Sequence, residues 1–320
     1  MEPALFDYHA FGMNIQSDIS LKGLLPNPSA SAVDVHVRKE KLSDKWGSRA
    51  GQDMFIYERN EILFQIEGVG VFSIRSGREI GYERAEGATD AYIRLYVMGS
   101  CLGLILMQRE ILPMHGSALY LQNMGIIITG DSGAGKSTTA AAFIKQGARL
   151  LSDDVIPVHW NETDPLIFPA YPQQKMWLNS LEQFGQTIEG LEHVVEREEK
   201  FNIPVQEHFH SSPVPMQTIV ELVPADTEEI TLVEVTGLAK LELLYRNTYR
   251  QFVIEPAGFS FWHFRALSAV AGRIPVYTLR RPINRFSADE VVEAVLDRLK
   301  GEEEYDRKAS DRAVYDTGGW

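Results

Sequence analysis

Over the first hundred positions, hydrophobic residues form short runs that polar residues, glycines and prolines interrupt. From 62 to 74 apolar and polar positions partly alternate, with glycines at 68 and 70, which predicts a twisted hairpin or bulged strands. Residues 78–82 predict one more strand. The apolar run over 95–107, bracketed by Arg94 and Arg109, predicts a buried helix within 90–107, because it is too short to span a bilayer.

From position 114 apolar strands alternate with helix-forming stretches. Strands are predicted over 114–120, 125–129, 149–155, 218–223, 230–235 and 276–279, and helices over 139–146, 238–249 and 287–301. Gly147 stops the first of these helices, and Ser287 with Glu290 predicts a capping box for the last. The charged stretch over 189–212 predicts a mobile surface loop. The fold class is therefore α/β.

These patterns predict three parts. Residues 1–110 form a small β-rich N-terminal domain with a linking helix, residues 111–301 form the larger α/β domain, and residues 302–320 form a polar tail.

Composition narrows the function classes. The net charge of −13 argues against nonspecific binding to nucleic acid, which depends on basic surface. The single cysteine, Cys101, excludes an internal disulfide and favours a reducing compartment. The first residues lack the basic and then apolar layout of a signal peptide. We therefore expect a cytoplasmic protein with neither nucleic acid nor membrane as a partner.

One glycine-rich stretch predicts a phosphate site. A glycine, four further residues and then Gly-Lys-Ser lie between a predicted strand and a predicted helix, where helix N–H groups bind anions. The residues are Gly130, Asp131, Ser132, Gly133, Ala134, Gly135, Lys136, Ser137 and Thr138. Lys136 would bind the β- and γ-phosphates of ATP, and the Ser137 hydroxyl would bind Mg²⁺. A glycine-rich turn that binds nothing is the alternative, and the flanking strand and helix argue against it.

Asp153 and Asp154 close the next predicted strand after a single short helix. Phosphoryl transfer needs a carboxylate near Mg²⁺ and, in a kinase, a base for the proton of the acceptor hydroxyl. Adjacent strand residues point to opposite faces, so one acid could face the metal and the other the acceptor. The alternative is an aspartate pair that only ends a strand in a turn.

Three motifs together resemble a known family. His115-Gly116, GDSGAGKST at 130–138 and LLSDDV at 150–155 resemble the catalytic domain of HPr kinase/phosphorylase in order and separation. The resemblance extends over 112–300 and implies a phosphate-loop core related to phosphoenolpyruvate carboxykinase. Residues 171–177 and 246–250, with the N-terminal part, resemble more loosely the HPr-kinase-like proteins associated with ribosomally made peptides, including lasso-peptide precursor kinases.

The resemblance implies a role for each matching residue. Asp153 corresponds to the base that deprotonates the acceptor serine, and Asp154 to its partner near the metal. His115 corresponds to the histidine beside that base and the transferred phosphate, although a core histidine bonded to backbone is the alternative. The family also has an arginine near the phosphates that comes from a later segment. Arg250 is the first candidate for this arginine and Arg246 the second; the alternative is an arginine on a solvated helix face.

The chain also departs from the family pattern. The glycine-rich segment that HPr enzymes carry after the acid pair is absent, and YPQQKMW and a glutamate-rich stretch occupy its place. HPr as substrate and the reverse phosphorylase activity are therefore in doubt. Lys175 and Lys200 in this region are either phosphate or peptide contacts or solvated lysines. His208 and His210 lack a third ligand in register, so we interpret them as surface residues.

The sequence thus predicts an ATP- and Mg²⁺-dependent kinase that phosphorylates a serine hydroxyl on a peptide or small protein, with a lasso-peptide precursor as the sharper hypothesis. The alternatives are a true HPr kinase/phosphorylase and a regulator that binds or hydrolyses ATP without a phospho-acceptor. A small-molecule kinase or carboxykinase relative is a further alternative. It would need extra basic residues clustered over the phosphate loop, and the acidic stretch over 182–199 does not indicate them. The family also assembles as homo-oligomers.

Overall fold

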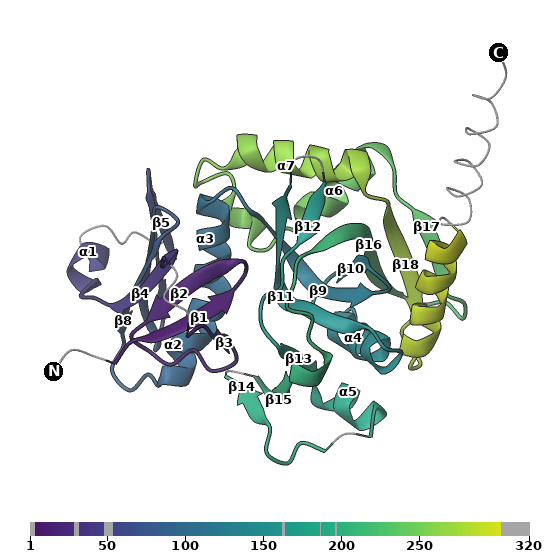
Figure 1. Ribbon diagram of the computed structural model, residues 1–320, viewed down its shortest axis with the longest axis horizontal. Coiled ribbons are helices and arrows are strands. Elements are labelled where there is room, and N and C mark those ends of the chain that lie inside the picture. The colour runs from purple at the N-terminus through teal and green to yellow at the C-terminus, as the bar shows by residue number, and fades with distance from the viewer. Residues whose placement is uncertain are drawn as a thin grey trace.

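The computed structural model describes residues 4–28, 32–47, 54–161, 164–185, 187–195 and 197–301. The predicted polar tail over 302–320 lies outside them. Figure 1 shows two β-sheets side by side with a helical segment between them. The division into domains at residue 110 stays a prediction.

The first sheet has eight strands within the described residues, in the order β3-β1-β2-β4-β8-β7-β6-β5. They are β1 (Phe6–Ala10), β2 (Met13–Ser17), β3 (Leu25–Pro26), β4 (Val35–Lys39), β5 (Phe55–Glu58), β6 (Glu61–Ile66), β7 (Gly70–Arg75) and β8 (Glu79–Arg84), with the short helix α1 (Ser43–Gly47) after β4. β6, β7 and β8 pair antiparallel where the alternating pattern predicted strands. The sequence did not predict β1 to β4, because prolines and serines break up their apolar residues.

The helical segment consists of α2 (Asp90–Tyr96), the π-helical turn η1 (Val97–Cys101) and α3 (Leu102–Gln108). By length and composition alone, Asp90–Gln108 is a candidate membrane span with a mean hydropathy of 1.4. In the structure 67% of this stretch is buried inside the protein, in one core with the first sheet and with Val155 and Tyr171 of the second part. The predicted buried helix is therefore confirmed.

The second sheet has seven strands within the described residues, in the order β10-β9-β11-β12-β16-β18-β17. They are β9 (Leu112–Leu121), β10 (Met124–Thr129), β11 (Arg149–Trp160), β12 (Pro165–Ile167), β16 (Val214–Ala225), β17 (Thr231–Glu234) and β18 (Val276–Pro282). β10 also pairs in parallel with β16, so the pairings of β9, β10, β16, β12 and β11 close into a ring.

Helices cover both faces of this sheet (Figure 1). Ile126 and Ile128 of β10 pack with α4 (Lys136–Lys145) and with a helix over 288–301. Ile127, one residue away on the same strand, packs with α6 (Gly237–Arg246) and α7 (Ser260–Arg273). The period of two along a strand explains why the apolar run of β10 is buried on both sides.

A third, three-stranded sheet corrects one prediction. β14 (Glu192–Val194) and β15 (Arg197–Pro204) lie within the predicted surface loop over 189–212, and β15 also pairs with β13 (Gln173–Trp177). Met176 and Phe201 of this sheet pack with Leu181 of α5 (Leu178–Gln183) in a small core of their own. The sequence did not predict this core, because charged residues separate its few apolar residues along the chain. Short 3₁₀ turns, η2 (Gln206–His208) and η3 (Gln251–Val253), complete the described elements.

Close packing of β9 against β10 leads to a first prediction. A Cβ atom on Gly116 would lie 2.3 Å from the carbonyl oxygen of Ile128, which is backbone and cannot move aside cheaply. We expect Gly116→Ala to lower the free energy of unfolding by about 1–3 kcal/mol, as overpacking does. Urea denaturation measures it, with Gly272→Ala in α7 as control, because nothing lies within 4 Å of that site. Equal stability of the two variants would contradict this account of the pairing.

Candidate active site

The glycine-rich stretch forms a loop between β10 and α4. Gly130, Gly133 and Gly135 have φ angles of 132°, 83° and 100°, in the left-handed region that favours glycine. A Cβ on Gly130 would also lie 2.5 Å from the carbonyl oxygen of Leu222. The loop therefore needs glycine at these positions and directs the first backbone N–H groups of α4 into an open cleft.

Lys136 folds back over this loop. Its Nζ donates to the carbonyl oxygens of Gly130 at 2.8 Å and Asp131 at 2.9 Å. These contacts hold the ammonium group beside the loop amides, where a phosphate group would meet both. Burial lowers the pKa of Lys136 from its ordinary value, although the nearby carboxylates of Asp153 and Asp154 oppose that shift.

The two predicted acids lie opposite β9, with Asp153 paired to Ser117 and Asp154 to Gly116. Asp153 is 5% exposed, and its Oδ1 accepts from the hydroxyls of Ser117 at 2.6 Å and Ser137 at 3.3 Å. Its Oδ2 accepts from the backbone N–H of Lys175 at 2.8 Å. Asp153 thus connects the central sheet, the first turn of α4 and β13.

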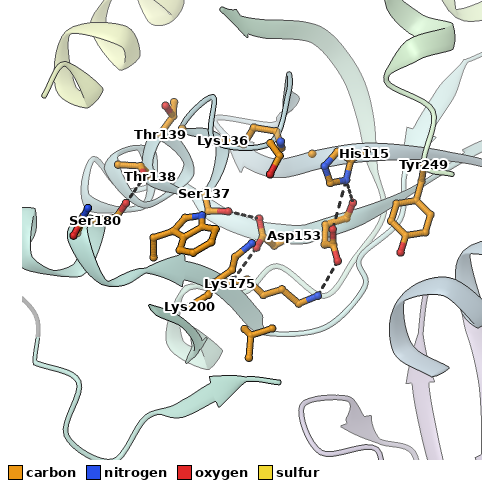
Figure 2. A pocket seen from close by; sticks show the side chains of 18 of the residues that line it. His115, Lys136, Ser137, Thr138, Thr139, Asp153, Lys175, Ser180, Lys200 and Tyr249 are labelled. Carbon is orange, nitrogen blue, oxygen red and sulfur yellow. Dashed lines mark hydrogen bonds and ion pairs between the residues drawn. The ribbon is translucent and has the colours of Figure 1, made fainter. Parts of the chain in front are cut away.

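Asp154 has a backbone φ of 82°, which is rare for a residue with a side chain. Its Oδ2 accepts from the Lys175 ammonium at 2.7 Å, and its Oδ1 lies 3.5 Å from His115 Nδ1. The same His115 nitrogen lies 3.0 Å from the Asp154 carbonyl oxygen. Figure 2 shows Asp153 between Ser137 on one side and His115 on the other.

Lys175 is a residue for which the sequence left two interpretations open, a contact in the cleft or a solvated lysine. The solvated interpretation is wrong for this lysine, because its side chain is only 15% exposed and pairs with Asp154. The lysine lies on β13, directly opposite Asn202 of β15. The three-stranded sheet brings it to the acids, so no local pattern could have shown that its partner is Asp154.

The environment separates the two carboxyl groups. Burial raises the pKa of Asp153, and the charge of Asp154 adds to this, while the Lys175 N–H and the Ser117 hydroxyl oppose it. Burial would also raise the pKa of Asp154, but the Lys175 ammonium and His115 outweigh it, so the pKa lies below its ordinary value. Burial lowers the pKa of His115, despite the Asp154 charge, which favours the neutral imidazole at pH 7.

The predicted arginines have different partners. Arg246, the second choice, donates from Nε and Nη2 to the carboxylate of the buried Glu221, at distances of 2.7 to 3.0 Å. Arg250, the first choice, donates from Nη2 to Ser100 Oγ of η1 at 2.7 Å and lines the cleft. A third arginine, which the sequence did not suggest, touches the loop itself: Arg281 Nε donates to the Ala134 carbonyl oxygen at 2.8 Å.

These residues surround one cleft of about 770 Å³. Its walls come from the glycine-rich loop, from β13 with Trp177, from the loop that carries Tyr249, and from the helical segment with Leu95 and Tyr96. The N-terminal part thus contributes directly to the cleft, which the sequence did not predict.

Magnesium fits one corner of this cleft. Ser137 Oγ and Asp153 Oδ1 are hard oxygen donors 3.3 Å apart, and Mg²⁺ is commonly held by one or two such groups together with phosphate oxygens and water. Among the described residues no group of three or more His, Cys, Asp and Glu side chains could hold a metal. His210, which the sequence predicts to be a surface residue and not a metal ligand, stacks on Tyr120 with ring centres 4.0 Å apart.

The opposed pKa shifts predict opposite effects on stability. Because folding raises the Asp153 pKa above 3.8, its ionised form is unfavourable above the raised pKa, and the cost vanishes as pH falls below 3.8. We expect Asp153→Asn to unfold at a higher temperature than the wild type at pH 7, with a difference that shrinks as pH falls.

Asp154→Asn is the matched variant. It leaves the buried Lys175 ammonium without its partner, so we expect a loss of about 2–4 kcal/mol at pH 7. Thermal unfolding between pH 4 and pH 8 measures both variants. The electrostatic description would be wrong if the two substitutions shifted the melting temperature in the same direction.

Comparison with known proteins shows which part of the chain is similar to a known family. Residues 108–181 match the profile of the HPr Serine kinase C-terminal domain. The HPr kinase/phosphorylase of Pediococcus pentosaceus is 44% identical over 57 residues, which is 18% of each chain. That of Lacticaseibacillus casei is 32% identical over 117 residues, 33% of this chain and 36% of the relative.

The chain therefore matches these curated relatives over only 18% to 36% of their length. Among solved structures, the Hpr(Ser) kinase/phosphatase from Coxiella burnetii has a TM-score of 0.33 at 17% identity, over 60% of this chain and 98% of that one. The profile match contains His115, the glycine-rich loop and both acids. The likeness is thus to the segment that carries the candidate site.

Proposed function

We propose that this protein is an ATP- and Mg²⁺-dependent kinase that transfers the γ-phosphoryl group to a serine hydroxyl of a peptide or small protein. One observation carries the proposal: an acid pair, with Asp153 buried and Asp154 partly exposed, lies beside Lys136 and Ser137, where the glycine-rich loop joins β10 to α4. Phosphoryl transfer depends mainly on positioning and on compensation of charge, and this arrangement offers both.

The nucleotide's phosphates would lie against the loop amides and the Lys136 ammonium. Ser137 and one carboxylate would hold Mg²⁺, which supplies positive charge to the phosphate oxygens when bound. In the reaction the acceptor oxygen bonds to the γ-phosphorus, the bond from that phosphorus to the bridging oxygen breaks, and ADP leaves. The acceptor proton passes to a carboxylate. Arg250 is our candidate for the cation that contacts the transferred group from the opposite wall.

The contacts favour a division of roles between the acids that exchanges those predicted from the sequence. Asp153 is the carboxylate next to Ser137, which supports a role as metal ligand. Asp154 lies beside His115 and lines the same cleft as Tyr249 and Arg250, which supports a role as base. The raised pKa of Asp153 favours Asp153 as the base, as predicted from the sequence. A general base must first lie within hydrogen-bond distance of the proton that it removes, however, and only then does its pKa decide the role.

Amide variants of the two acids distinguish these assignments. We expect Asp154→Asn to lower kcat about 10²- to 10⁴-fold, as loss of a general base does, with little change in MgATP affinity. We expect Asp153→Asn to weaken MgATP binding and to shift the magnesium dependence to higher concentration. Calorimetric titration with MgATP, beside single-turnover transfer assays, measures both. The reverse pattern would restore Asp153 as the base.

The acceptor is the finer part of the proposal. A lasso-peptide precursor is the sharper hypothesis, because residues 171–177 and 246–250 loosely resemble the kinases associated with ribosomally made peptides. A true HPr kinase/phosphorylase fits the matched segment equally well. The cytoplasm as location and a homo-oligomeric assembly belong to the same proposal.

Radiolabelled ATP tests the acceptor directly. We expect label to pass from the γ-position to a serine of a peptide or small protein when the enzyme is incubated with lasso-type precursor peptides and, separately, with HPr. Lys136→Met serves as the control, since it removes the ammonium beside the loop. Release of phosphate to water with no labelled acceptor would instead support the regulator, and transfer to HPr alone would exclude the lasso-peptide hypothesis.

A further inference from the structure

The cleft extends past the glycine-rich loop on the side away from His115 and Asp154. In Figure 2 Thr138, Thr139 and Ser180 lie on one side of Ser137, while His115 and Tyr249 lie on the other. The first side is not used by the transfer chemistry. It is bordered by α5 and by the stretch between β18 and the helix over 288–301, and both contribute to the lining of the cleft.

Arg281, at the end of β18, is the first unexplained group on this side. Its Nε donates to the Ala134 carbonyl oxygen and its Nη1 to that of Pro282 at 3.0 Å, so the plane of the guanidinium is held in place. Its Nη2 would lie 3.1 Å from a Cβ on Gly135, at the start of α4. Within the described residues no carboxylate forms an ion pair with it. A half-buried cation at a helix start, without a counter-ion, is suited to an anionic ligand.

Ser287 is the second unexplained group. Its hydroxyl is buried and has no hydrogen-bond partner among the described residues, although the residue is 4% exposed and lines the cleft. The predicted capping box does not form, because Glu290 binds Arg285 instead. A buried hydroxyl without a partner is costly, and a ligand that bonds to it would remove that cost.

Phe286 lies next to Ser287 and is 40% exposed. Its ring meets Phe184, after α5, edge to face with centres 5.6 Å apart. This contact orients the ring, while a large part of its surface remains open to the cleft. An oriented and exposed aromatic ring is a stacking platform for a nucleobase.

We infer that this end of the cleft is the nucleoside subsite, where Arg281 contacts the α- and β-phosphates and Phe286 and Ser287 contact the base and ribose. The inference rests on the proposed function. A triphosphate whose terminal phosphorus faces the acid pair, and whose chain follows the loop, has its nucleoside on the opposite side. That side carries the cation and the hydroxyl that lack a partner among the described residues, and the exposed ring.

The test compares two ligands on the intact protein, MgATP and magnesium tripolyphosphate, which has the phosphates without the nucleoside. We expect Phe286→Ala and Ser287→Ala to weaken ATP binding about tenfold and about threefold, and to leave tripolyphosphate binding unchanged. We expect Arg281→Ala to weaken binding of both ligands about tenfold, and Arg281→Lys to restore part of it. Calorimetric titration measures the affinities, and melting temperatures check that each variant is folded.

Matched controls lie close by. Arg280→Ala removes the exposed neighbour of Arg281 on the same strand, and Phe261→Ala removes a phenylalanine of α7 that is 76% exposed and does not line the cleft. Both should bind the two ligands like the wild type. Unchanged ATP affinity in Phe286→Ala and Ser287→Ala would overturn the subsite while leaving the kinase proposal intact. Wild-type protein that binds neither ligand would overturn the proposed function and the subsite with it.

Discussion

The candidate site depends on the interaction of Lys175 with two adjacent carboxylates. Its backbone N–H binds Asp153 and its ammonium binds Asp154, so one residue satisfies both acids from a single strand. Without Lys175, burial and the repulsion between the two carboxylates would both favour protonation of the acids. The three-stranded sheet that carries Lys175 is thus part of the site, and the small core around Met176 and Phe201 supports the chemistry indirectly.

The same principle of distant support applies to the opposite wall. Arg250 reaches the cleft with its guanidinium bonded to Ser100, which lies on the buried helical segment of the N-terminal part. That segment shares one core with Val253 and Ile254, just after Arg250. The arginine is therefore held from two sides, and the N-terminal sheet positions a wall of the cleft.

The overall acidity of the chain contrasts with the cleft. The net charge is −13, yet the cleft is lined by Lys136, Lys175, Arg250 and Arg281. Positive groups gathered at low-dielectric walls attract polyanions far more strongly than net charge would suggest. Within the described part of the chain, Lys136 and Arg281 donate only to carbonyl oxygens, whereas Lys175 is paired with Asp154. This difference agrees with the proposed roles, in which Lys136 and Arg281 contact phosphate and Lys175 holds the acids in place.

Local sequence determined the central part of the site. The glycine-rich loop, its flanking strand and helix, and the acid pair lie close together in the chain, and the glycine spacing and the hydrophobic periodicity of this stretch predict their backbone conformation directly. It also determined the buried helix over 90–107 and the hairpin from β6 to β8. Tertiary structure alone decided the remainder. Lys175, Arg281 and Ser287 come from distant strands and turns, and they matter only because sheet pairing brings them to the loop. The three-stranded sheet was hidden for the same reason, since its few apolar residues become a core only when strands far apart in the chain meet.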